Sequence, residues 1–206
     1  MPPLRELRSF DRFDEDKQVE PLRRYYLISE GENTEVDYFK GLINNRREIG
    51  IYPLVDIVVL EREEDVRSHS DPKRLYELII SKIDELKKSD SYIKEIDKFI
   101  IIFDRDSFKS EELYHEFIRQ IDDEVGITVT SPCFELWLLL HFENSIDEHI
   151  LPNESVILQN AKVSNKHTFT SRLFSQIANT NPKKGICFED YMNNLQCAID
   201  QEKRIC

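Results

Sequence analysis

The sequence has few glycines and cysteines, and it has no long apolar run. Only 5 of the 206 residues are glycine, which argues against repeats built from tight turns. The 4 cysteines form no CxxC pair, so we expect neither a disulfide framework nor a zinc site, and a reduced, cytoplasmic protein is the simplest interpretation. The most apolar run, residues 134–142, contains two polar residues and is far shorter than the roughly 20 residues of a membrane span. We therefore expect no membrane association.

Positive charge is also scarce. The chain has 28 Lys and Arg against 40 Asp and Glu, a net charge of −12. This balance argues against a general basic coat for nucleic acid or anionic lipid, but it does not exclude a nuclease that holds its substrate through metal ions. The charge is uneven: residues 151–206 carry 7 basic and 5 acidic side chains (+2), and residues 1–150 therefore carry −14.

Short apolar runs alternate with helical patterns along most of the chain. The runs at 25–28, 53–60, 98–103 and 126–130 predict strands, and helical spacing follows each of them. The run at 98–103 is almost continuously apolar, as is typical of a parallel strand buried on both faces. The alternation predicts an α/β fold with a mostly parallel sheet flanked by helices.

The domain organisation follows from the same pattern. Residues 1–21 are polar and bracketed by prolines, so we predict a flexible tail there. Residues 22–142 form the predicted α/β core. Residues 143–206 form a small helical C-terminal extension of the same domain, in which 143–166 is expected to be irregular and helices are expected around 168–180 and 187–204.

Two acidic clusters follow predicted strands. Glu30 comes after the first strand, and Asp104-Arg105-Asp106 comes after the third. The carboxyl ends of parallel strands are where functional groups gather, and residues two apart in an extended segment point to the same side. A lone DxD is more typical of caps and turns. Two clusters after separate strands favour a Mg²⁺ or Mn²⁺ site with Glu30, Asp104 and Asp106 as ligands.

Other polar residues have two interpretations each. Glu35 is either a further metal ligand or a carboxylate of the first turn of a helix. Glu135, at the start of an apolar helix, is either a ligand or a carboxylate held by hydrogen bonds or ion pairs. His141 is more typical of a hydrogen-bonded helix histidine than of a catalyst, and Cys133 is more typical of a small buried residue than of a nucleophile.

Basic candidates for nucleic-acid contact are few. Lys183 and Lys184 precede the last helical segment, where they either touch phosphates near the acidic site or form a solvated pair. Arg105 lies inside the DxD and points either toward a nucleic acid or away from the metal.

Three long motifs carry a family resemblance over about residues 22–204. RRYYLISEGENTEVDYFKGL, IIFDRDSF and SPCFELWLLLHFE resemble, in order and spacing, the motifs of the RloB-like proteins. That family resembles the Toprim fold of topoisomerases, primases and overcoming-lysogenization-defect nucleases, in which a glutamate follows the first strand and a DxD follows a later one. The positions that match here are Glu30, Asp104 and Asp106.

The resemblance implies a metal-dependent nuclease acting on DNA or RNA. It also implies a role in antiphage or abortive-infection defence, often beside an AAA-type ATPase partner. A different class of function stays open: a non-catalytic interaction module that docks to such an ATPase, with a vestigial or structural metal site. The sequence also leaves open whether the chain forms a homo-oligomer.

Overall fold

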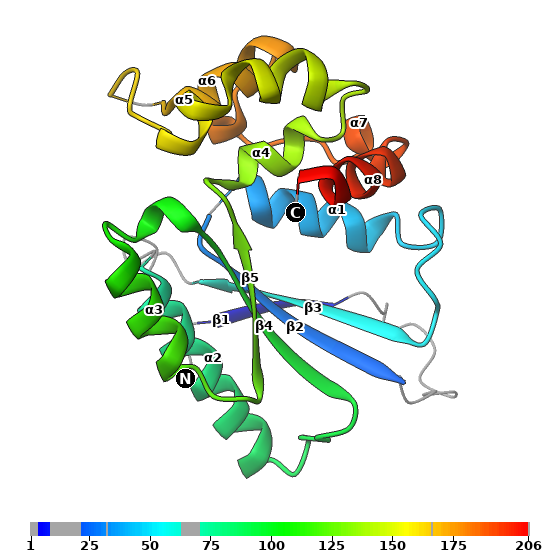
Figure 1. The fold of residues 1–206 in the computed structure, drawn as a ribbon. Coiled ribbons are helices and arrows are strands. Elements are labelled where there is room, and N and C mark those ends of the chain that lie inside the picture. Colours follow the sequence, from blue (N-terminus) through cyan, green and yellow to red (C-terminus); the bar gives the residue numbers. More distant parts are fainter. Residues whose placement is uncertain (1–3, 9–21, 32, 63–70, 166, 206) are drawn as a thin grey trace.

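The computed structural model of the chain describes residues 4–8, 22–31, 33–62, 71–165 and 167–205. Its centre is a five-stranded sheet with strand order β1-β3-β2-β4-β5 (Figure 1). The strands are β1 (Leu4–Arg8), β2 (Arg23–Ser29), β3 (Val55–Arg62), β4 (Asp97–Asp104) and β5 (Val125–Thr130). Strands β2 to β5 are parallel, and β1 pairs antiparallel with β3. The predicted α/β fold with a mostly parallel sheet is confirmed.

Helices cover both faces of the sheet (Figure 1). Helices α2 (Pro72–Lys88) and α3 (Glu111–Gln120) lie on one face, and α1 (Thr34–Asn44) lies on the other. The C-terminal helices form a further layer beyond α1; they are α4 (Phe134–Leu139), α5 (Glu154–Gln159), α6 (Phe169–Ile177), α7 (Glu189–Met192) and α8 (Leu195–Ile205). Of these, α4, α6 and α7 share an apolar cluster with α1. No described helix is long and apolar enough to cross a bilayer.

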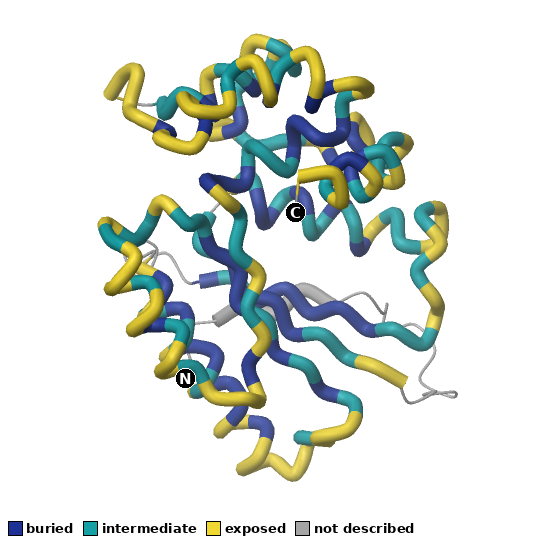
Figure 2. The backbone as a smooth tube through the Cα atoms, in the orientation of Figure 1, coloured by how far each residue is buried: buried dark blue, intermediate teal, exposed yellow. Residues whose placement is uncertain are grey.

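Strand β4 is buried on both sides, which explains its continuous apolar sequence. Phe99, Ile101 and Phe103 pack against the layer of α2 and α3, whereas Ile102 packs toward α1. Figure 2 shows the buried residues concentrated on the central strands and on the inner sides of the helices. The sheet is therefore held rigidly between two apolar layers, and the ends of its strands are fixed in space.

A third apolar layer joins α1 to the C-terminal helices. The Tyr38 ring packs edge-on against Phe134 and Phe188, and its hydroxyl donates to Nε2 of His141 at 3.1 Å. Nδ1 of His141 lies 3.1 Å from the carbonyl of Trp137, so the imidazole is a neutral tautomer that donates from Nδ1. Burial lowers the pKa of His141 to about 4. His141 is thus the hydrogen-bonded helix histidine that the sequence favours.

Two predictions about irregular segments are contradicted at some of the described residues. The predicted tail, 1–21, contains strand β1, which supplies backbone partners to the edge of β3; residues 1–3 and 9–21 lie outside the described residues. Residues 143–166 contain a helical turn, Ile146–Ile150, and helix α5. The buried side chains of Ile146, Ile150 and Ile157 pack with α4 and α8, and this burial orders the segment despite its polar composition.

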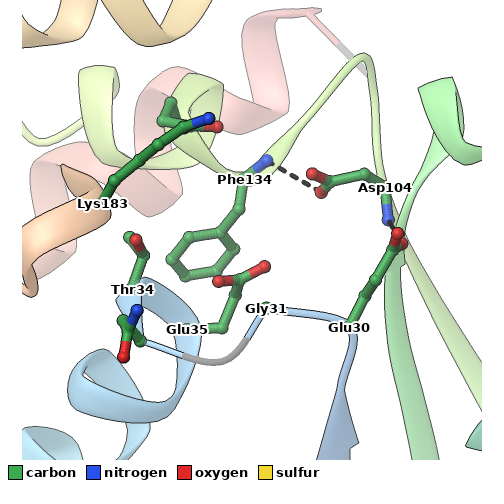
Figure 3. A pocket seen from close by; sticks show the side chains of 9 residues that line it. Glu30, Gly31, Thr34, Glu35, Asp104, Phe134 and Lys183 are labelled. Carbon is green, nitrogen blue, oxygen red and sulfur yellow. Dashed lines mark hydrogen bonds between the residues drawn. The ribbon is translucent and has the colours of Figure 1, made fainter. Parts of the chain in front are cut away.

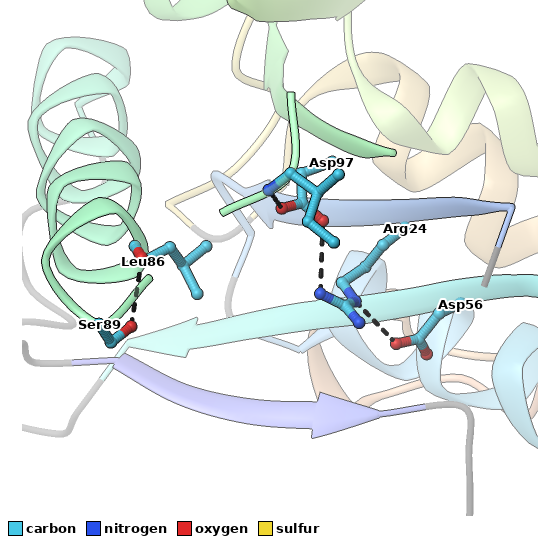
Figure 4. A network of polar contacts seen from close by, with 6 residues as sticks. Arg24, Asp56, Leu86, Ser89 and Asp97 are labelled. Carbon is cyan, nitrogen blue, oxygen red and sulfur yellow. Dashed lines mark hydrogen bonds and ion pairs between the residues drawn. The ribbon is translucent and has the colours of Figure 1, made fainter. Parts of the chain in front are cut away.

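An ion-pair network joins the amino ends of three strands. Arg24 of β2 lies directly between its cross-strand partners, Asp56 of β3 and Asp97 of β4 (Figure 4). Its guanidinium contacts Asp56 Oδ2 at 3.3 Å and Asp97 Oδ1 at 3.4 Å. The Asp97 side chain is fully buried, and its other oxygen accepts from the Ile93 N–H at 2.8 Å. Arg24 thus neutralises two carboxylates at the end of the sheet opposite Glu30 and Asp104.

Replacing Arg24 should destabilise the fold strongly. Arg24→Met keeps the apolar stem but removes the guanidinium that pairs with two largely buried carboxylates, which should lower the free energy of unfolding by about 3 kcal/mol. The exposed Arg119 of α3 offers the matched control, because Arg119→Met removes a surface charge only. Urea unfolding of the two variants measures the difference. Equal free energies of unfolding for the two variants would show that the Arg24 network does not contribute to stability.

Candidate functional site

A pocket of about 470 Å³ opens at the carboxyl end of the sheet (Figure 3). Its lining includes the carboxylates Glu30, Glu35, Asp104 and Glu135, together with Lys183. Glu30 directly follows β2, and Asp104 ends β4. Glu35 and Glu135 lie in the first turns of α1 and α4. Four separate elements therefore bring carboxylates to one place, although they are far apart along the chain.

Asp104 is held by the next strand and by the helix that follows it. Its Oδ1 accepts hydrogen bonds from Thr130 Oγ1 at 2.5 Å and from the Phe134 N–H at 2.9 Å. The second of these bonds is drawn in Figure 3. Both donors act on the same oxygen, so Oδ2 keeps its capacity to bind another group.

Glu30 ties β2 to the loop after β4. Its Oε2 accepts from the Asp104 N–H at 3.1 Å, and its Oε1 accepts from Ser107 Oγ at 2.5 Å. The Glu30 carbonyl accepts from Arg62 of β3 at 2.6 Å. The position of Glu30 is therefore fixed from three directions, while each carboxylate oxygen retains a second lone pair.

Glu35 is the most buried of the four carboxylates, with 8% of its surface exposed. Its carboxyl lies against Gly31: a Cβ at residue 31 would lie 1.7 Å from Glu35 Oε2, so any larger residue there would displace this carboxyl. Burial raises the pKa of Glu35 to about 7, and the charges of Glu135 and Glu30 add to this rise. Hydrogen bonds from backbone N–H groups offset only part of the effect.

The other carboxylates are affected in the same direction. Burial, followed by the charge of Glu35, raises the pKa of Asp104 well above its ordinary value. Burial also raises the pKa of Glu30, and the charge of Asp106 adds to it. Burial is thus the largest cause of each raised pKa, and the negative charges of neighbouring carboxylates add to it.

The structure corrects the expected geometry of the DxD. Residues Arg105–Ser107 form a one-turn 3-10 helix, so Asp104 and Asp106 do not leave an extended strand on one side. Asp106 is exposed and does not line the pocket; its Oδ2 accepts from Asn160 Nδ2 at 2.7 Å. Burial, and then the charge of Glu135, still raises the pKa of Asp106, so it remains within electrostatic reach of the pocket.

The three basic candidates separate in space. Lys183 lines the pocket, whereas Lys184 is exposed and is not part of the lining. Arg105 turns toward α3, where it pairs with Glu111 at 2.5 Å and lies over the Tyr114 ring at 4.5 Å. Cys133 is buried, and burial raises the pKa of its thiol well above the ordinary value. This cysteine is therefore a poor nucleophile.

The pocket has the donor chemistry of a hard divalent cation. Its ligands are carboxylate oxygens, which Mg²⁺ and Mn²⁺ prefer, and they carry uncompensated negative charge. Within the described part of the chain, however, no three His, Cys, Asp or Glu groups are arranged to hold one ion. Hydrogen bonds from Thr130, Ser107 and Asn160 use part of the acceptor capacity of Asp104, Glu30 and Asp106. The donor set fits, and side-chain rearrangement is needed to bring three donors onto one ion.

Comparison with known families decides the classification. The model of the RloB-like proteins matches residues 25–206, which includes every residue of the pocket. The chain belongs to the RloB-like family. No curated protein and no solved structure matches this RloB-like chain.

Sequence reasoning missed the residues that hold the acidic groups in place. Thr130, Ser107 and Asn160 each donate to a different carboxylate. Ser107 lies within the motif IIFDRDSF, but its residue type gave no sign that it binds an acidic group. Thr130 gave a weak signal: it is the last residue of a predicted strand, and the ends of parallel strands lie at the same edge of the sheet as Asp104. Asn160 offered none, since its position depends on a helix that the polar sequence did not predict.

Neutralising Glu35 should stabilise the metal-free protein above neutral pH. Its folded pKa, about 7, exceeds the ordinary 4.5, so the folded state binds more protons and stability is lost as pH rises between these values. Glu35→Gln should therefore raise the free energy of unfolding by about 1–3 kcal/mol near pH 8 and by much less near pH 5. Denaturant unfolding in the presence of a chelator measures both values.

The exposed Glu116 of α3 supplies the control for this substitution. Glu116→Gln removes one negative charge without changing the pocket, so it should leave stability nearly unchanged at both pH values. Equal destabilisation by Glu35→Gln at both pH values would contradict the repulsive cluster and would indicate that the carboxylate is a structural acceptor.

Proposed function

We propose that this RloB-like protein is a divalent-metal-dependent nuclease of the Toprim type that cleaves DNA or RNA. We also propose that it acts as an effector of antiphage or abortive-infection defence, under the control of an AAA-type ATPase partner. The observation that supports the nuclease is the convergence of Glu30, Glu35, Asp104 and Glu135 on one pocket at the carboxyl end of a parallel sheet. Burying such a charge cluster costs free energy when no cation is bound. With a divalent cation, the same carboxylates become ligands for metal-ion catalysis.

The residues have separate roles in this proposal. Asp104 presents its open oxygen, Oδ2, to Mg²⁺ or Mn²⁺, and Glu35 and Glu135 face the same space. Glu30 would be a further ligand or the general acid–base, and Asp106, which does not line the pocket, would be a ligand at its rim. A bound cation would lower the pKa of a water molecule and neutralise charge on the scissile phosphate. Lys183 places a positive charge beside the carboxylates, where it can contact a substrate phosphate.

One observation favours a second candidate function. Among the described residues no three potential ligands are arranged around one ion, and Asp106 does not line the pocket. A non-catalytic module that docks to the ATPase partner would not need these acidic side chains to lie close enough to share one ion. In that case the acidic groups would serve docking or structure, and nucleic acid would not be cleaved.

Cleavage assays with matched variants distinguish the two functions. Wild-type protein with Mg²⁺ or Mn²⁺ and the ATPase partner should degrade DNA or RNA, and Asp104→Asn should abolish this activity because a neutral amide is a poor ligand for a hard cation. Arg105→Ala should retain most of the activity, since Arg105 faces α3. The exposed Asp123→Asn serves as the charge control. Equal degradation by wild type and Asp104→Asn would reject the nuclease and support the docking module.

A further inference from the structure

Asn160 occupies an unusual position at the end of helix α5. It is 6% exposed and adopts a left-handed conformation, with φ of 40° and ψ of 39°. Its backbone N–H donates to the carbonyls of Val156 and Ile157, both at 3.0 Å, and closes the helix. Asparagine is among the few residues that tolerate this conformation, and the geometry turns its side chain inward.

The side chain of Asn160 uses both ends of its amide. Oδ1 accepts from the Thr170 N–H in the first turn of α6 at 3.1 Å, and Nδ2 donates to Asp106 Oδ2 at 2.7 Å. The backbone N–H of Thr170 can only donate, so the amide oxygen must face it and the NH₂ group must face Asp106. The orientation of the amide is thus determined by chemistry at both ends.

Asp106 is anchored on its other side by the core. Its N–H donates to the carbonyl of Pro132 at 3.2 Å, in the segment between β5 and α4. The hydrogen bond from Asn160 to Oδ2 therefore fixes the rotamer of Asp106, and both carboxylate oxygens retain a lone pair that can bind a cation. The hydrogen bond between Asn160 and Asp106 joins residues 54 positions apart and connects the C-terminal extension to the acidic motif of the core.

We infer that Asn160 is a positioning residue that orients Asp106 toward a divalent cation bound at the pocket. This inference rests on the proposed function, because it requires a cation there. Outer-shell partners of this kind hold a ligand in one rotamer, and their loss typically lowers metal affinity by roughly 10–100-fold. The helical extension then contributes to the site through this amide as well as through Lys183, which lines the pocket.

The decisive substitution is Asn160→Asp. Aspartate keeps the volume, tolerates the left-handed conformation and still accepts from Thr170, but it presents a carboxylate to Asp106 in place of a donor. Asn144→Asp is the matched control, since Asn144 is also left-handed, with φ of 56°, and is exposed. Isothermal titration with Mn²⁺ measures affinity in the folded protein, and thermal melts without metal report stability separately.

Asn160→Asp should weaken Mn²⁺ binding by about 10-fold or more, whereas Asn144→Asp should bind as wild type does. If Asn160→Asp does not fold, Asn160→Gly, which retains the left-handed backbone and removes the amide, should show the same loss. A lower melting temperature with unchanged Mn²⁺ affinity would overturn the positioning role. If Asp104→Asn abolishes Mn²⁺ binding in the same experiment, the proposed cation site still stands and only the role of Asn160 is rejected. No Mn²⁺ binding by wild type would overturn both the proposed function and the role of Asn160.

Discussion

The burial of several carboxylates close together is the constraint on which the rest of this structure depends. Glu35 and Asp104 both have raised pKa values because they are buried beside other negative charges. Side chains left free would move apart toward water. Here hydrogen bonds from Thr130, Ser107 and backbone N–H groups keep the carboxylates in place. The fold therefore stabilises an arrangement that is unfavourable without a cation.

The layers of the fold explain how this arrangement is maintained. Two apolar layers fix β2 and β4, so Glu30 and Asp104 are carried on rigid strand ends. The third layer, around Tyr38, joins α1 to α4 and places the first turns that carry Glu35 and Glu135 beside the strand ends. At the opposite end of the sheet, Arg24 neutralises Asp56 and Asp97. Acidic groups are thus compensated where they serve the fold and uncompensated at the pocket.

The sequence predicts strand order along the chain and strand ends better than it predicts contacts between distant segments. Glu30 and Asp104 could be assigned to one edge because parallel strands share an edge. The extended geometry assumed for Asp106 was wrong, because a 3-10 turn begins directly after Asp104. Strand β1 and helix α5 were missed for another reason. Both segments are short, and they are ordered by tertiary pairing and burial, which no local pattern encodes.

Direct location of a cation is the measurement that tests this view of the pocket most sharply. Crystals of the wild-type protein soaked in Mn²⁺ and measured near the manganese absorption edge would show the ion by its anomalous signal. We expect a peak beside Asp104 Oδ2, with further ligands among the carboxylates of Glu30, Glu35, Glu135 and Asp106, at about the 2.0–2.2 Å ligand distances of a hard divalent ion. An empty pocket, or a peak bound only to exposed carboxylates elsewhere, would contradict it.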